Sequence, residues 1–133
     1  KHLDELEKAT PGAHFLEKHG KQTTLASQLE RLQTAKNPTT GIVEYFTSGP
    51  KAGEPKYPPA ATHFFSHRDQ LNAIHRAQLI FRRNGLAQSL KPMHMGKIVG
   101  EGYSGNEMQY SQQSKARVIL NSAGQPKTAY TEL

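Results

Sequence analysis

The pattern of apolar and polar residues predicts helices in the first part of the chain. Residues 2–9 ("HLDELEKA") and 12–20 ("GAHFLEKHG") are typical of short helices, and Gly20 is suited to end the second one. In residues 23–36 ("TTLASQLERLQTAK") leucines recur at spacings of four and three behind a threonine, which indicates one capped amphipathic helix. Arg31 lies off this leucine stripe and can therefore face outward.

The middle of the chain predicts a strand, a long loop and a second clear helix. Residues 41–46 ("GIVEYF") are typical of a strand, whereas 47–62 are rich in Pro, Gly and Lys and predict an irregular surface loop. After the extended segment "HFF", Ser66 and Asp69 form an S-x-x-D capping box for a helix over 67–84, and a glycine follows it. The residues expected on the buried face of that helix are Leu71, Ile74, Ala77 and Phe81.

In the last part of the chain, apolar and polar residues alternate as they do in strands. Residues 96–103 and 115–120 predict strands, and 121–126 ("NSAGQP") supply turn residues for a hairpin that returns as a final strand over 127–131. An antiparallel sheet is the simplest outcome. We therefore expect one α+β domain over 1–133, with N-terminal helices packed on a C-terminal, mainly antiparallel β-sheet.

Composition narrows the functions that this domain can have. The chain has no cysteine, which excludes disulfides, a thiolate nucleophile and a cysteine metal site. It has no apolar run near the roughly 20 residues of a membrane span and no leader sequence, so we expect no membrane association. Its 17 Lys and Arg against 11 Asp and Glu give a net charge of +6, which attracts polyanions, above all nucleic acid. An acidic protein partner is equally compatible with that charge.

The acidic residues are not arranged as metal ligands. They are scattered, without a D-x-D or H-E-x-x-H pattern, so we expect neither a metal site nor a cofactor. Gly100, Gly102 and Gly105 lie close together, but no G-K-[ST] follows them and no helix pattern does either. We interpret these glycines as turn or bulge residues.

The remaining chemistry suits RNA cleavage without a metal. Such cleavage requires a general base for the 2'-hydroxyl proton, a general acid for the leaving 5'-oxygen, and a cation for the charge of the phosphorane. "HFLEKHG" places His14, Lys18 and His19 within a turn and a half of a helix, and histidine titrates near neutrality. A single histidine is more often a surface or capping residue, but two histidines that flank a lysine in a basic chain shift the balance toward a site.

Three short motifs resemble a known family. A "KHG" box near the start, an arginine a dozen residues later on the following helix, and a terminal "TAY" strand are similar to the C-terminal ribonuclease toxin domains of bacterial contact-dependent growth inhibition proteins (CdiA). In particular they resemble the CdiA toxins that share the pancreatic ribonuclease fold without its disulfides. The resemblance implies a ribonuclease-like toxin fold and a catalytic site of His19, Arg31, Thr128 and Tyr130.

A second toxin group also resembles the chain. The barnase, EndoU and colicin-like nucleases use one or two histidines, a lysine, and a Thr or Ser two residues before a Tyr on a late strand. Under this resemblance the substrate-binding residues are His14, Lys18 and Lys97, and His63 becomes a second candidate histidine. The sequence leaves the choice between the two topologies open.

The expected reaction is transphosphoesterification, in which the 2'-oxygen attacks the adjacent phosphorus and leaves a cyclic phosphate. We expect His19 to act as base or acid, Arg31 to clamp the phosphate, and Thr128 and Tyr130 to position or protonate phosphate oxygens. Lys51, Lys56 and the arginines of the 67–84 helix would hold the rest of the RNA.

The resemblance also implies a biological setting. Transfer RNA is the commonest substrate of such toxins, and a cognate immunity protein, expected to be acidic, protects the producing cell. The domain would be cut from a large cell-surface filament and delivered to the cytoplasm of a neighbouring bacterium, where some toxins need a host activator protein. We expect a monomer. The alternative from another class is a non-catalytic basic module that binds nucleic acid or an acidic protein through the same Lys and Arg.

Overall fold

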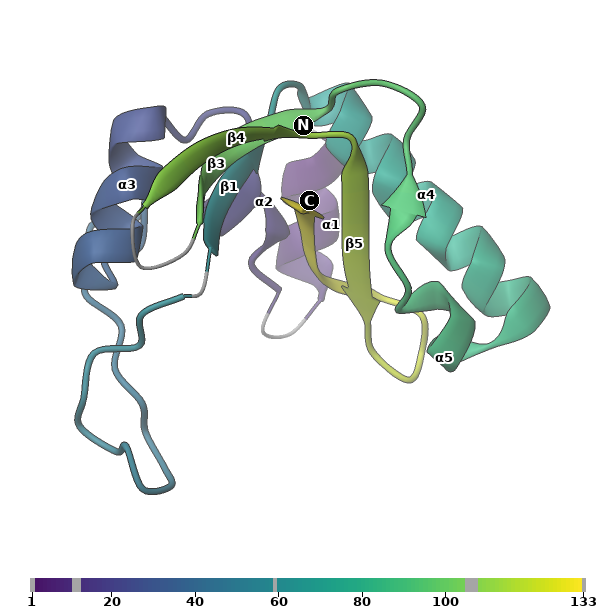
Figure 1. Ribbon diagram of the computed structural model, residues 1–133. Coiled ribbons are helices and arrows are strands. Elements are labelled where there is room, and N and C mark those ends of the chain that lie inside the picture. Colours follow the sequence, from purple (N-terminus) through teal and green to yellow (C-terminus); the bar gives the residue numbers. More distant parts are fainter. Residues whose placement is uncertain (1, 11–12, 59, 105–107, 133) are drawn as a thin grey trace.

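The predicted α+β class is confirmed by the computed structural model (Figure 1). It describes residues 2–10, 13–58, 60–104 and 108–132. Within these ranges the helices are α1 (His2–Ala9), α2 (Phe15–His19), α3 (Leu25–Thr34), α4 (His67–Asn84) and α5 (Leu86–Ser89). The strands are β1 (Ala60–Phe64), β2 (Met93–His94), β3 (Gly100–Ser104), β4 (Gln109–Gln113), β5 (Lys115–Leu120) and β6 (Pro126–Glu132).

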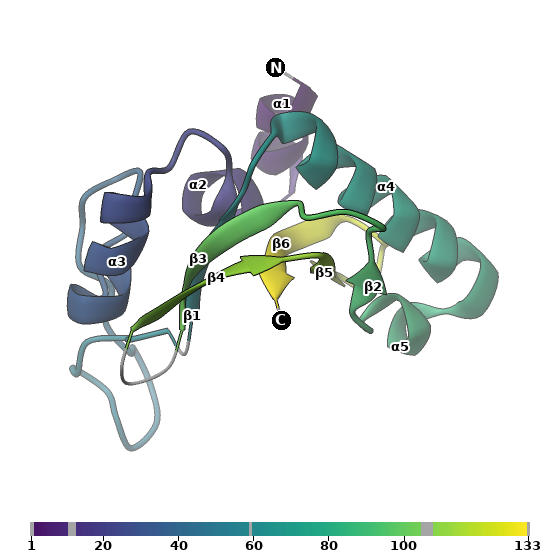
Figure 2. The ribbon, with the colours of Figure 1, turned by 45° about the horizontal axis from the view of Figure 1, so that its top comes forward.

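The strands form two antiparallel sheets of three strands each, with the orders β1-β3-β4 and β2-β5-β6. The predicted hairpin of the last part is confirmed as β5 and β6, which pair from Lys115 opposite Glu132 to Leu120 opposite Pro126. A bulge lies between Ile119 and Leu120. The helices pack against these sheets, and α2 lies between α3 and α4 (Figures 1 and 2). No helix among the described residues is long and apolar enough to cross a membrane.

The predicted helix starts are confirmed by their caps. The Thr24 hydroxyl accepts a hydrogen bond from the Ser27 backbone N–H at 3.0 Å, and the Ser27 hydroxyl oxygen accepts one from the Thr24 N–H at 2.9 Å. At the start of α4 the Ser66 hydroxyl accepts from the Asp69 N–H at 3.0 Å. Ala35, in the left-handed conformation at φ 64°, ends α3. These local bonds explain why both helices could be located from sequence.

The buried face of α3 differs from the prediction. Gln28, Arg31 and Leu32 are buried, whereas Leu25 and Leu29 are only partly buried. Arg31, which spacing leaves free to face outward, is thus buried instead. The helix packs on β1 and β3 through a stripe that carries polar side chains, which a search for apolar spacing does not detect.

The core lies between α4 and the second sheet and extends to α2 and β1. Its large, fully buried side chains include Phe15, Phe64, Ile74, Val99 and Val118. On α4 the predicted Ile74 and Ala77 are fully buried, and the predicted Leu71 and Phe81 pack partly buried against the same cluster. The remaining buried positions of this helix are Asp69, Gln70 and Ala73.

The predicted strand over 41–46 is wrong. This segment belongs to residues 36–57, an arm that projects from the body of the protein (Figure 1). Its two sides are joined by isolated bridges between Lys36 and Val43 and between Tyr45 and Pro55. Proline lacks the N–H that would extend a ladder, so the pairing stays short.

Two glycines of β3 have a different role from the predicted one. Gly100 and Gly102 pair in regular register with both neighbouring strands, so they are neither turn nor bulge residues. A Cβ atom at Gly100 would lie 2.5 Å from the Thr131 side chain and 2.6 Å from the His63 carbonyl oxygen. Glycine is therefore required for the close approach of β6 to β3. Gly105 lies outside the described residues.

The two sheets are joined by side-chain hydrogen bonds. The Thr62 hydroxyl donates to the Thr131 carbonyl oxygen at 3.0 Å, and the Thr131 hydroxyl donates to Gln113 Oε1 at 2.9 Å. These bonds connect β1 to β6 and β6 to β4. They fix the final strand beside the strand that follows the arm.

Candidate functional site

A cleft of about 470 Å³ lies where α2 and α3 meet β1 and β6. The four residues expected to be catalytic, which are far apart in the sequence, all line it, together with His14. The complete lining is His14, His19, Arg31, Pro58, Ala60, Thr62, Ser104, Gln113, Thr128, Tyr130, Thr131 and Glu132. The structure thus brings residues of the "HFLEKHG" segment and of the "TAY" strand to one place.

His19 is buried at the C-terminal end of α2, and a hydrogen bond determines which ring nitrogen carries its proton. Its Nδ1 lies 2.9 Å from the Thr62 carbonyl oxygen. A carbonyl oxygen only accepts, so Nδ1 donates, and Nε2 of the neutral ring carries the lone pair. Burial lowers the pKa of His19 well below its ordinary value of 6.5, and the charge of Arg31 lowers it further. His19 is therefore neutral at pH 7.

Two aromatic rings surround His19. The ring centroid of Tyr130 lies 5.5 Å from that of His19, and the His14 centroid lies 6.5 Å away. Burial raises the pKa of Tyr130, and although the charge of Arg117 opposes this, the carboxylate of Glu132 adds to it. The Tyr130 phenol is therefore protonated at neutral pH and can donate a hydrogen bond or a proton.

Arg31 brings a positive charge to the cleft. Its side chain is buried, and Nη1 has no hydrogen-bond partner among the described residues. Burial lowers the pKa of Arg31 while the Glu44 carboxylate acts in the opposite direction, and a guanidinium remains charged at neutral pH. A buried donor without a partner is costly, so this nitrogen is suited to bind an anionic oxygen.

Thr128 has a second buried polar atom without a hydrogen-bond partner. Its hydroxyl oxygen is buried and has no partner within the described part of the chain. Two polar atoms without partners, Arg31 Nη1 and Thr128 Oγ1, thus belong to residues that line the same cleft. A phosphate group has enough acceptor oxygens to satisfy both donors.

Two fully buried glutamines hold α2 in place. Gln28 of α3 donates through Nε2 to the Lys18 carbonyl oxygen at 2.6 Å and to the Thr23 hydroxyl at 2.9 Å. The bond to Lys18 joins α3, the helix that carries Arg31, to the residue before His19. The sequence gives no sign that Gln28 is buried, because a glutamine among leucines is typical of the exposed side of a helix.

Gln70 of α4 holds the other end of α2. Its Nε2 donates to the Phe15 carbonyl oxygen at 2.6 Å and to the Ala129 carbonyl oxygen at 3.3 Å, so it joins α2 to β6 between Thr128 and Tyr130. The backbone N–H of His14 donates to the Lys127 carbonyl oxygen at 2.8 Å and strengthens the same contact. No sequence signal distinguished Gln70 from the exposed polar residues of its helix.

Lys18, Lys97 and His63, three of the residues expected to bind substrate, do not line the cleft. Lys18 forms an ion pair with Glu44 at 2.9 Å. Burial would raise the pKa of Glu44, but the hydrogen bonds of Lys18 and Asn37 and the charges of Lys18 and Arg31 together outweigh it, so this pKa lies below its ordinary value. Lys97 is paired with Asp69 at 3.1 Å, near the start of α4. Both lysines therefore have structural partners.

The ring of His63 is held on the far side of β1 from the cleft-lining Thr62. Its Nδ1 donates to the Thr23 carbonyl oxygen at 2.6 Å, and its Nε2 lies 2.9 Å from Glu101 Oε2. Glu101 also accepts a hydrogen bond from the Tyr110 hydroxyl at 2.8 Å. His63 thus connects the start of α3 to the first sheet and does not contact the candidate site.

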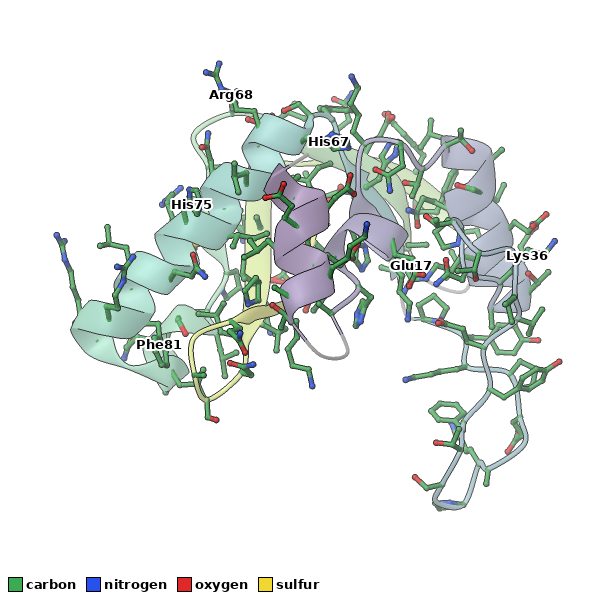
Figure 3. All side chains as sticks on the ribbon, turned by 180° about the vertical axis from the view of Figure 1, so that it is seen from behind. Glu17, Lys36, His67, Arg68, His75 and Phe81 are labelled. Atoms are coloured by element: carbon green, nitrogen blue, oxygen red, sulfur yellow. The ribbon has the colours of Figure 1, made fainter. Side chains whose placement is uncertain are left out.

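A second hollow, of about 410 Å³, has the opposite electrostatic character. Its lining includes Glu17 and His67, which Figure 3 labels, and the carboxylates of Asp4 and Glu7. Carboxylates repel phosphate, so this hollow is not suited to RNA. Among the described residues no group of three or more His, Asp or Glu side chains is placed to hold a metal ion.

Comparisons with known protein families, with curated proteins and with solved structures found no match for this chain. The functional interpretation therefore depends on the geometry and electrostatics of the cleft.

Proposed function

We propose that this protein is a metal-independent ribonuclease whose active site is the cleft between α2, α3 and β6. The observation that carries the proposal is the combination of a neutral, buried His19 with the unpartnered guanidinium nitrogen of Arg31 in one cleft. A base beside an unsatisfied cation suits a reaction that removes a proton and develops negative charge on a phosphate.

In the proposed reaction Nε2 of His19 takes the proton of the 2'-hydroxyl. The 2'-oxygen then attacks the adjacent phosphorus, and the bond from phosphorus to the 5'-oxygen breaks. Tyr130 gives its phenolic proton to the leaving 5'-oxygen and regains one from His19 at the end of the cycle. Arg31 and the Thr128 hydroxyl hold the non-bridging oxygens, whose charge increases in the transition state. The products are a 2',3'-cyclic phosphate and a 5'-hydroxyl end.

A direct test is to incubate the purified protein with total RNA in the presence of EDTA and to analyse the fragment ends. We expect fragments with cyclic phosphate ends from the wild type and none from His19→Ala. The matched control is His75→Ala, which alters an exposed histidine of α4 and should cut as the wild type does. Binding of RNA without cutting would instead support a non-catalytic nucleic-acid-binding module, and cutting by His19→Ala would refute the site.

The resemblance to CdiA toxin domains extends the proposal to growth inhibition of neighbouring bacteria, with transfer RNA as the substrate and an acidic immunity protein as the partner. Inducible expression in a bacterial host tests this part. Induction of the wild type should stop growth, whereas induction of His19→Ala should not. If growth continues although the purified protein cuts RNA, the protein is a ribonuclease but the toxin part of the proposal fails.

A further inference from the structure

The arm formed by residues 36–57 exposes aromatic rings next to the cleft. Of the seven large apolar side chains that are exposed among the described residues, Ile42, Tyr45 and Tyr57 belong to the arm or its end. The two tyrosines are 53% and 55% exposed. Rings gathered on a projecting segment are typical of a binding surface, because a monomer gains nothing by exposing them together.

The pairing of the arm determines which side chains share a face. Tyr45 pairs with Pro55, and the Lys56 N–H donates to the Glu44 carbonyl oxygen at 2.8 Å. Since side chains alternate along extended segments, Tyr45 and Tyr57 occupy diagonal positions on one face of this ribbon. Diagonal neighbours lie roughly 7–8 Å apart, so a single flat ligand can contact both rings.

Two lysines of the arm lie beside the ring of Phe46. The Nζ atoms of Lys51 and Lys56 each lie 6.0 Å from the centroid of the Phe46 ring. Neither ammonium group forms an ion pair within the described ranges. The arm therefore combines exposed rings with cations that are available to phosphate oxygens.

The arm is continuous with the cleft and is fixed relative to it. Pro58, directly after Tyr57, and Ala60 both line the cleft. At the root of the arm, where Figure 3 labels Lys36, the Glu44 N–H donates to the Ala35 carbonyl oxygen at 2.9 Å. The ion pair of Glu44 with Lys18 ties the same root to α2. A polymer that leaves the cleft past Pro58 meets the rings of the arm next.

We propose that the arm is a docking surface for single-stranded RNA, which stacks bases on Tyr45 and Tyr57 and places its phosphates near Lys51 and Lys56. This inference rests on the ribonuclease proposed above and adds the substrate class. Unpaired bases expose their faces to aromatic side chains, whereas the bases of a duplex are stacked on each other. The arm therefore selects RNA that is single-stranded on one side of the bond to be cut.

Binding is measured in a His19→Ala background, so that the RNA stays intact. The probe is a fluorescein-labelled single strand of about twelve nucleotides, within the range of site sizes for such proteins, and the readout is fluorescence anisotropy. We expect the double variant Tyr45→Leu, Tyr57→Leu to bind about ten-fold more weakly or worse, because base stacking on aromatic rings is lost. The matched variant Tyr45→Phe, Tyr57→Phe keeps both rings and should bind as the parent does.

A second measurement separates the arm from the cleft. With His19 intact, a dinucleoside monophosphate is too short to reach the arm, so the Leu variant should cut it at the wild-type rate while cutting long RNA more slowly. Leu79→Ala, which removes an exposed apolar side chain of α4, should change neither rate.

Several results would overturn the inference. The first is that the Leu and Phe variants bind the single strand equally well. The second is that the Leu variant loses as much affinity for a duplex as for the single strand. The third is that the Leu variant cuts the dinucleotide as poorly as it cuts long RNA. The two proposals fail separately: absence of all cleavage by the wild type refutes the ribonuclease, whereas unchanged anisotropy refutes the arm. Loss of binding to a protein partner with unchanged RNA binding would identify the arm as a protein interface instead.

Discussion

The backbone carbonyl oxygen of Thr62 holds Nδ1 of His19 at 2.9 Å, and this bond joins the end of α2 to β1 between two residues that line the cleft. Because the acceptor belongs to the backbone, substitution of the Thr62 side chain does not remove it. The tautomer of His19 is thus determined by the fold. His19 presents Nε2 as its basic nitrogen as long as α2 remains in place.

The first prediction concerns the dependence of activity on pH. His19 must be unprotonated to act as base, and its pKa lies well below 6.5, mainly through burial. We therefore expect kcat/KM to stay level as the pH falls through 6.5 and to decline only at lower pH. Arg31→Met should move this decline to higher pH, because the charge of Arg31 is the second cause of the shift. A decline centred at or above 6.5 in the wild type would contradict the assignment of His19 as base.

A second prediction concerns stability. The folded pKa of His19 is depressed, so the unfolded chain binds the proton more readily than the folded one does. The neutral His19 ring therefore contributes fully to the free energy of unfolding above its unfolded pKa of 6.5. As the pH falls below 6.5, this contribution is lost, and the free energy of unfolding falls by at most about 1.4 kcal/mol per pH unit. Urea unfolding of His19→Gln should show a shallower loss of stability over this range than the wild type. His75→Gln, at an exposed position, should match the wild type, and equal slopes for all three proteins would be inconsistent with the shift.

The third prediction separates activity from stability at Arg31. The guanidinium is buried with Nη1 unpartnered, so Arg31→Met should not lower the free energy of unfolding. The same change should lower kcat/KM by about a hundred-fold or more, because the phosphate charge loses its clamp. Lys8→Met removes an exposed positive charge from α1 and should change neither quantity. Loss of several kcal/mol of stability in Arg31→Met would indicate a structural role.

The fourth prediction concerns the glutamine that fastens α2 to α3. Gln28→Leu removes the bonds to the Lys18 carbonyl oxygen and the Thr23 hydroxyl. The loss leaves buried acceptors unsatisfied, so we expect a destabilisation of about 1–3 kcal/mol and a lower kcat. Gln33 is exposed on the same helix, and Gln33→Leu should change the stability by about 0.5 kcal/mol or less. Chemical denaturation and cleavage assays on both variants check this, and equal stabilities would refute it.

The fifth prediction concerns the close approach of the two sheets. A Cβ atom at Gly100 would lie 2.6 Å from the His63 carbonyl oxygen, which belongs to the backbone and cannot rotate away. We expect Gly100→Ala to cost more than the roughly 1–3 kcal/mol of ordinary overpacking. Gly53→Ala meets no atom within 4 Å and carries only the cost of its φ of +88°, roughly 1–2 kcal/mol. Thermal unfolding distinguishes them, and a milder effect at Gly100 than at Gly53 would contradict the structure.

Local signals predicted the fold where each element carries its own pattern. The caps at Thr24 and Ser66 located two helices, and the alternation around Val118 located the final hairpin. Strand β4 was not expected, because its sequence "QYSQQ" is polar apart from Tyr110, which is exposed and does not mark a buried face. The arm was mistaken in part for a strand because β-branched and aromatic residues occur together over 41–46.

The candidate site depended on information of a different kind. Motif resemblance selected His19, Arg31, Thr128 and Tyr130, and the structure places all four at one cleft, although their catalytic roles stay predictions. Spacing alone did not indicate that Arg31 is buried, since a polar residue is buried only when the tertiary structure supplies a reason. For the same reason, nothing in the sequence indicated that Gln28 and Gln70 are buried.

The cleft joins α2 and α3 to β6, which has a consequence for how the protein is made. Residues 19 and 31 leave the ribosome long before 128 and 130, and contacts of such long sequence separation form slowly because the loop between them must close first. A chain still under synthesis therefore lacks the Thr128 hydroxyl and the proton donor Tyr130 beside its base. The proposed activity begins only when β6 docks, so a cell that translates this sequence is exposed to the finished fold and not to the growing chain.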